Sequence, residues 1–92
     1  MKVNFYATLR AIVGQKTVEI EPFPGMTAQQ IVEKVVTVYP ALRPELLDEN
    51  NHFQDHMKFF INGREAIYLE DKMNTVIHLD DKVDIFPPVG GG

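Results

Sequence analysis

One amphipathic segment, residues 28–39, constrains the fold of this 92-residue chain more than any other feature. Thr27, with Gln30 three residues later, has the pattern of a capping box and predicts a helix start. The helix should end before Pro40, because the residue preceding a proline disfavours the α region. Most apolar positions are β-branched valines, which form helices only moderately well, so this helix needs a second layer to pack against. The apolar stripe at helical spacing consists of Ile31, Val32, Val35, Val36, Val38 and Tyr39.

Segments that alternate apolar and polar residues lie on both sides of the helix and predict strands. Two precede the helix and form a predicted hairpin, and two or three follow it. The resulting order, ββαβ(β)β, indicates an α+β domain in which the helix covers one face of a sheet. The first and last strands could pair in parallel at its centre. The predicted strands span residues 2–13, 17–21, 58–61 and 82–86, with 76–79 as a short strand or extended segment.

Composition indicates one globular domain without covalent crosslinks. Apolar residues make up 45% and charged residues 24%, which is ordinary for a folded chain. No cysteine is present, so disulfides, thiolate metal sites and cysteine nucleophiles are excluded. The first residues lack the apolar run of a signal peptide, and no stretch is long enough to span a membrane. We expect a soluble cytoplasmic protein.

Charge is distributed unevenly along the chain. Residues 1–44 contain five basic and three acidic residues, whereas residues 45–92 contain four basic and ten acidic ones. An acidic half argues against binding nucleic acid, which requires clustered Lys and Arg. It would suit steering toward a basic protein partner, although a solvated surface explains the same pattern.

The C-terminal end differs from an ordinary terminus. Pro87 and Pro88 end the last strand abruptly and stiffen the chain, and three glycines follow Val89. Glycines can lie in a channel too narrow for any side chain. Fully extended, residues 87–92 span roughly 20 Å, enough to enter a partner's buried active site. A frayed glycine end is the alternative, but such an end needs no stiff lead-in.

The residues at both ends resemble one family. Residues 84–92, Asp-Ile-Phe-Pro-Pro-Val-Gly-Gly-Gly, look like the terminus of MoaD, the small subunit of molybdopterin synthase. Residues 2–14 resemble that family's first strand and turn, and the longer loop at 49–57 looks closer to its archaeal branch. The resemblance implies a β-grasp, ubiquitin-like fold with a mixed four- to five-stranded sheet and one main helix. We expect this domain over residues 1–86 and a flexible glycine-rich tail over 87–92.

The resemblance also implies a function. MoaD-like proteins are non-catalytic sulfur carriers: a MoeB-like enzyme uses ATP to adenylate the terminal glycine, which becomes a thiocarboxylate. A MoaE-like large subunit then uses that sulfur to make molybdopterin or its tungsten equivalent. In this chain Gly92 would carry the thiocarboxylate and Gly91 would be its unhindered neighbour. The positions implied to contact partners are Arg10, Phe86, Pro87, Pro88, Val89 and Gly90.

Three other functions use the same sequence features. The chain could be a ubiquitin-like modifier joined through Gly92 to lysines, as in part of the archaeal branch. It could feed thiamine synthesis, although such carriers lack the Phe-Pro-Pro lead-in. It could also be an interaction domain with an inert tail. Without the resemblance, Phe86 could equally be a core aromatic and Arg10 an ordinary surface residue.

Other candidate sites are weak. His52, Asp55 and His56 lie close together in sequence, but a metal site needs three or four ligands with supporting geometry, and this stretch is predicted to be a loop. The paired carboxylates at residues 70–71 and 80–81 occupy turn positions where Asp is favoured locally. Glycine-rich nucleotide motifs are absent, so we expect no cofactor on this chain and ATP only on its partner.

Overall fold

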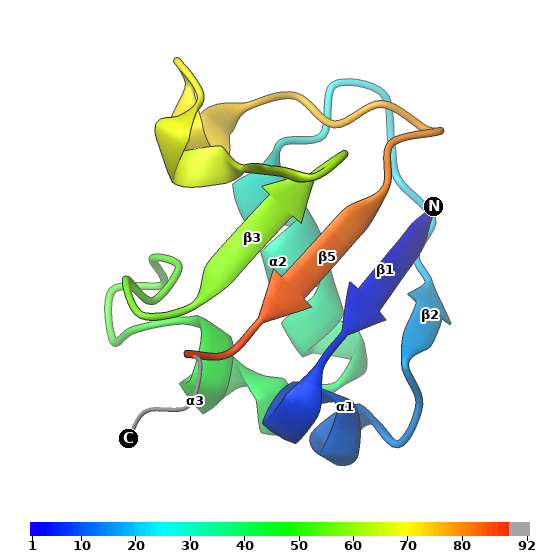
Figure 1. The fold of residues 1–92 in the computed structure, drawn as a ribbon, viewed down its shortest axis with the longest axis vertical. Helices are drawn as coiled ribbons and strands as arrows, with labels where there is room; N and C mark the ends of the chain where they lie inside the picture. The colour runs from blue at the N-terminus through cyan, green and yellow to red at the C-terminus, as the bar shows by residue number, and fades with distance from the viewer. Residues whose placement is uncertain (89–92) are drawn as a thin grey trace.

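The computed structural model describes residues 1–88 and contains a five-stranded mixed sheet in the order β2-β1-β5-β3-β4 (Figure 1). The central pair β1–β5 is parallel, with Val3 opposite Val83, and the remaining pairs are antiparallel. The parallel pairing of the first and last strands, which the sequence left open, is therefore present at the centre of the sheet. The strands are β1 Lys2–Phe5, β2 Thr17–Glu19, β3 Lys58–Ile61, β4 Arg64–Glu65 and β5 Val83–Phe86.

The main helix, α2 (Ala28–Val38), crosses one face of the sheet (Figure 1). The predicted capping box is present: the Thr27 hydroxyl accepts from the Gln30 N–H at 3.2 Å, and the Gln30 side-chain oxygen accepts from the Thr27 N–H at 2.9 Å. The predicted stripe packs on the sheet, except that Val38 is 53% exposed and Tyr39 is half-buried. The helix side chains in the core are Ala28, Ile31, Val32, Val35 and Val36.

Strand alternation sorts side chains onto two faces of the sheet. One residue in two points toward α2 and is buried in a single core, as Phe5, Phe59 and Ile85 illustrate. The intervening residues point to the face that α2 does not cover. That second face carries Phe86, the last residue of β5.

The prediction of one strand over residues 2–13 is wrong. β1 ends at Phe5, and helix α1 (Ala7–Val13) follows it directly. The chain turns at Ala7, whose φ of +53° breaks the extended conformation. Gly14, at φ +88°, ends the helix and donates its N–H to the Arg10 carbonyl at 2.8 Å. Such a left-handed glycine is a common helix terminator.

Tight turns and short helices connect the strands. The Asn62–Gly63 turn joins β3 to β4 with φ values of +52° and +82°, as a tight hairpin requires. Residues 43–46 form the short helix α3 (Arg43–Leu46). Residues 64–74 contain β4 and two of the three 3₁₀ turns. The 3₁₀ turns are η1 (Pro40–Leu42), η2 (Ala66–Tyr68) and η3 (Lys72–Asn74).

Within residues 1–88, no helix is long and apolar enough to cross a membrane. β5 ends at Phe86, where the predicted domain ends, and Pro87 and Pro88 are the last described residues. The predicted flexible tail lies largely outside the described residues and stays a prediction.

Candidate functional site

The face of the sheet opposite α2, here called the open face, is defined by one side of each strand. Its central residues are Asn4 and Tyr6 beside β5, Asp84 and Phe86 on β5, and Lys58 and Phe60 on β3. The strand register places Asn4 opposite Asp84, Asp84 opposite Phe60, and Phe86 opposite Lys58. Apart from Asp84 these side chains are half-buried rather than fully buried, so the face is available to a partner.

Three aromatic rings cluster on the open face where β5 ends. The Tyr6 ring stacks on the Phe86 ring, with centroids 4.1 Å apart and planes 9° from parallel. Phe60 contacts Phe86 edge-on, at 5.3 Å and 80°. Phe86 is thus held between two rings directly before Pro87. The start of the tail leaves the sheet from an ordered aromatic platform.

Two lysines flank this aromatic cluster. The Lys16 ammonium lies 5.3 Å from the centroid of the Tyr6 ring, within the range of a cation–π contact. Lys58 lies opposite Phe86 in the sheet register, and its ammonium is 3.6 Å from the Glu65 carboxylate. The end of the open face nearest the tail therefore combines apolar rings with exposed cations.

A polar network lies beside the aromatic cluster. Asp84 is 6% exposed, and one of its carboxylate oxygens, Oδ1, accepts from the Tyr6 hydroxyl at 2.8 Å and the Asn4 amide at 2.9 Å. The Thr17 hydroxyl donates to the Asn4 side-chain oxygen at 2.7 Å, and Lys82 lies 3.9 Å from the second Asp84 oxygen. Burial, followed by the hydrogen bond to Asp84 and the charge of that group, raises the pKa of Tyr6.

The far end of the open face has different chemistry. A hollow of about 460 Å³ lies between β1 and the chain preceding β5. Asp80, Asp81 and Glu19 contribute carboxylates to its lining, together with Lys2 and Lys82. The two ends of the open face therefore differ: the three rings lie near the tail, and Glu19, Asp80 and Asp81 lie at the far end.

Comparison with known proteins identifies the family. The model of the ThiS family matches residues 3–92, nearly the whole chain. The chain belongs to the ThiS family. Small archaeal modifier protein 3 of Haloferax volcanii is 33% identical over 92 residues, covering 100% of this chain and 98% of that protein.

Solved structures show the same fold for this ThiS family chain. The crystal structure of SAMP1 from Haloferax volcanii matches with a TM-score of 0.88 and 24% identity, covering 99% of this chain and 97% of that one. A Pyrococcus furiosus chain proposed to be subunit 1 of a molybdopterin converting factor matches with a TM-score of 0.75 and 24% identity, covering 96% and 95%. The predicted β-grasp, ubiquitin-like fold, the mixed sheet and the MoaD/ThiS-like family are confirmed. The chain is a member of the ubiquitin-like sulfur carrier and modifier family.

The structure places some of the predicted site residues of this family member together. Phe86 lies on the open face and not in the core cluster. Arg10 is exposed on α1, and its N–H contacts the Tyr6 carbonyl at 3.4 Å, so its helix begins beside the aromatic cluster. Pro87 and Pro88 follow Phe86 directly. The predicted residues Val89, Gly90, Gly91 and Gly92 lie outside the described residues.

Three residues that complete this site are missing from the sequence-based prediction. Tyr6, Phe60 and Asp84 contact Phe86 or one another, and none is a predicted site residue. A signal was present, because strand alternation puts Asp84 and Phe86 on one side of the last strand. Tyr6 was harder to assign, since its partners are distant in sequence and only the parallel β1–β5 pairing brings them together.

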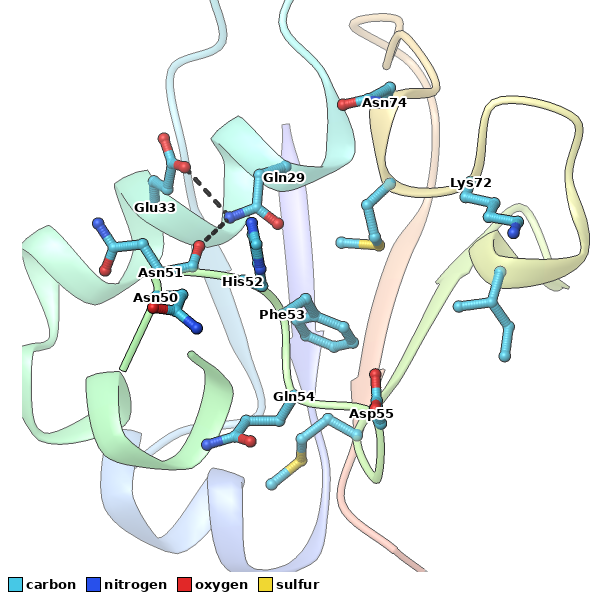
Figure 2. Close-up of a pocket in the computed structure, with 13 residues that line it drawn as sticks. Gln29, Glu33, Asn50, Asn51, His52, Phe53, Gln54, Asp55, Lys72 and Asn74 are labelled. Carbon is cyan, nitrogen blue, oxygen red and sulfur yellow. Dashed lines mark hydrogen bonds between the residues drawn. The ribbon is translucent and has the colours of Figure 1, made fainter. Parts of the chain in front are cut away.

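A second hollow, of about 740 Å³, lies on the opposite side of the molecule (Figure 2). It runs between the first turns of α2, the loop of residues 50–57 and η3. The Gln29 amide donates to Glu33 at 3.1 Å and to the Asn51 carbonyl at 2.7 Å, closing one wall. Within residues 1–88, no three His, Cys, Asp or Glu side chains are grouped closely enough to hold a metal, His52 and His56 included.

Proposed function

We propose that this chain is a sulfur carrier whose Gly92 carboxylate is activated by an adenylating enzyme. The observation that carries the proposal is that the ThiS family match extends through residue 92, the Gly-Gly end included. The carboxylate oxygen attacks the α-phosphorus of ATP and pyrophosphate leaves. Hydrosulfide then attacks the acyl carbon, AMP leaves, and a thiocarboxylate remains. The partner binds ATP, and this chain contributes a slim, reactive end without catalysing the step.

The sulfur acceptor in this proposal is the pterin precursor of molybdopterin or its tungsten equivalent. The support is the Phe-Pro-Pro-Val sequence of residues 86–89, which resembles the MoaD terminus. A MoeB-like enzyme charges the carrier. A MoaE-like large subunit then receives the tail and catalyses sulfur transfer.

The open face is the docking surface in this proposal. The rings of Tyr6, Phe60 and Phe86 supply apolar area at the point where the tail departs. Lys16 and Lys58 flank the rings, and Arg10 follows on α1. A partner that covers this end needs an apolar patch bordered by carboxylates. The basic partner suggested by the acidic half of the sequence does not match this end of the molecule.

Intact-mass analysis tests the proposal directly. The purified chain is incubated with a MoeB-like enzyme, Mg-ATP and sulfide. Replacing one oxygen by sulfur at an activated acyl group adds roughly 16 Da. The control is a chain lacking Gly91 and Gly92, which retains all of residues 1–88 and should not react. A wild-type chain that gains no mass with a competent cognate enzyme contradicts the proposal.

A second function is favoured by a specific observation. The relative with 33% identity across the chain is named a small archaeal modifier protein. In that role a lysine amine of another protein attacks the Gly92 acyl-adenylate, AMP leaves, and an isopeptide bond forms. Digesting lysate proteins and searching for lysines that carry a C-terminal remnant of this chain tests it. Absence of these adducts, in cells where the carrier is demonstrably charged, contradicts the modifier role.

A further inference from the structure

Asp84 is the only buried charged residue within residues 1–88. It lies on β5, the central strand, with Asn4 of β1 on one side and Phe60 of β3 on the other. A buried carboxylate is costly unless its oxygens are hydrogen-bonded. Its position two residues before Phe86, on the same face of the same strand, connects it to the tail exit.

The Asp84 carboxylate has matched partners. Oδ1 accepts from the Tyr6 hydroxyl at 2.8 Å and from the Asn4 amide at 2.9 Å, and Lys82 lies 3.9 Å from Oδ2. Hydrogen bonds to an ionised acceptor are stronger than those between neutral groups. The raised pKa of Tyr6 keeps its hydroxyl protonated and able to donate. The Tyr6 hydroxyl is therefore the donor and Asp84 the acceptor in this bond.

Tyr6 contacts β5 at two points. Its hydroxyl binds Asp84, and its ring stacks on Phe86 at 4.1 Å with nearly parallel planes. The two points fix the ring along the strand direction, so it cannot slide or tilt without breaking one contact. Lys16 lies close to the same ring, 5.3 Å from its centroid. Tyr6 therefore links Phe86 to a carboxylate that does not contact it.

We propose that Asp84, acting through the Tyr6 hydroxyl, is a positioning residue that sets the orientation of Phe86 and hence the direction in which the tail leaves the sheet. This inference rests on the proposed function, because direction matters only if the terminal carboxylate must reach a partner's reaction centre. Small misplacement of a reacting group has large effects: a shift of about 1 Å costs on the order of 100-fold in rate. Pro87 and Pro88 each fix φ and so stiffen the chain that follows Phe86 directly.

The test compares variants that keep the rings and change the anchor. Tyr6→Phe retains the stacked ring and removes only the donated bond, and Asp84→Ala removes the acceptor. Asp84→Asn keeps an acceptor oxygen and serves as the conservative rescue. Thr17→Val is the matched control, because it removes a hydrogen bond of the same network that does not reach Tyr6 or Phe86.

Pyrophosphate exchange by the adenylating enzyme is measured with the carrier concentration varied. We expect Tyr6→Phe and Asp84→Ala to lower kcat about tenfold while KM changes less than about twofold, because docking is retained and the reacting carboxylate is misdirected. The double variant Tyr6→Phe/Asp84→Ala should lose no more kcat than either single variant, because both changes remove the same interaction. Asp84→Asn should recover most of the rate, and Thr17→Val should match wild type.

The outcomes separate the two proposals. Wild-type chain that is never adenylated contradicts the proposed function, and the inference fails with it. If the wild-type chain and Tyr6→Phe are adenylated with the same kcat, this inference is overturned and the proposed function stands. A higher KM with unchanged kcat also overturns it, because Asp84 would then support docking and not tail direction. Thermal unfolding of each variant identifies any that has lost its fold. If an Asp84 variant has unfolded, the kcat of Tyr6→Phe, the mildest change, decides between the outcomes.

Discussion

Individual residues determine where this chain changes direction. Ala7 has a φ of +53° and Lys72 a φ of +48°, a region that costs L-residues with a Cβ about 1–2 kcal/mol. Asn51 and Asn62 also have positive φ, but asparagine tolerates it more readily. Ala7 is the junction between β1 and α1, so its strained backbone is what allows a helix to begin directly after a strand.

Ala7→Gly should therefore stabilise the protein. Glycine adopts positive φ without steric conflict, and this relief should exceed the entropy that glycine gains in the unfolded chain. We expect the free energy of unfolding to rise by about 1 kcal/mol, measured by urea denaturation. Ala11→Gly is the matched control, since Ala11 is also exposed on α1 but is absent from the positive-φ positions. Ala11→Gly should lower the free energy of unfolding by about 0.5–1 kcal/mol. The same change in free energy of unfolding for both variants would contradict the role of strain at Ala7.

At the scale of elements, α2 depends on its first turn and on the sheet beneath it. Its interior is rich in β-branched residues, so propensity contributes little and packing contributes most. The capping box satisfies two backbone donors that would otherwise have no partner. The order of the start of α2 should then depend strongly on Thr27.

Thr27→Ala should lower the free energy of unfolding by about 1 kcal/mol. Thr37→Ala is the control on the same helix, because the Thr37 hydroxyl donates to the Glu33 carbonyl inside the helix and caps nothing. That change should stay within about 0.5 kcal/mol of wild type, as surface substitutions usually do. Chemical denaturation measures both variants, and a Thr37 effect as large as the Thr27 effect would be inconsistent with capping.

The loop after α3 is organised by Asp48. Its carboxylate accepts from the backbone N–H groups of Asn50 at 2.8 Å and His52 at 2.9 Å. These bonds, with that from His52 the largest contribution, hold the pKa of Asp48 below its ordinary value of 3.8. A carboxylate whose pKa is lower in the folded state stabilises the fold above its unfolded pKa. This contribution should diminish as pH falls through the native pKa.

Asp48→Asn removes the titration and keeps a side-chain oxygen. The difference in free energy of unfolding between wild type and this variant should be constant near pH 7 and shrink below about pH 4. Urea denaturation over pH 2.5–7 measures it. A difference that stays flat to the lowest pH would show that the loop does not depend on the ionised form.

At the scale of the whole molecule, lysines lie on both sides of the sheet but border different surfaces. Lys16 and Lys58 border the aromatic end of the open face, whereas Lys72 lies beside the groove near α2 on the opposite side (Figure 2). Charges that border a docking surface mainly affect association rate and salt dependence.

Charge reversal distinguishes the two surfaces. Lys16→Glu should raise the carrier's KM for the adenylating enzyme about tenfold at low salt, and the difference should narrow as ionic strength rises. Lys72→Glu makes the same change in net charge and should leave KM within about twofold of wild type. Equal effects of both reversals would indicate that net charge matters and the open face does not.

Much of this molecule could be predicted from local pattern. The α2 helix, its capping box and the last strand each depend on neighbouring residues and were predicted correctly. Helix α1 was missed because alternation continues to Thr8, although Leu9, Ile12 and Val13 have helical spacing and Gly14 is a typical helix terminator. The short β4 was missed because two residues carry too little pattern.

The sequence alone determined the fold class, the main helix and the family resemblance, because each follows from local patterns and short motifs that can be recognised one segment at a time. Only the tertiary structure decided that Phe86 belongs to the open face and that Tyr6 and Asp84 complete its surroundings. Tyr6 and Asp84 are 78 residues apart and meet because β1 and β5 pair in parallel. No local pattern encodes that pairing, since it follows from burying both strands beneath α2 at once.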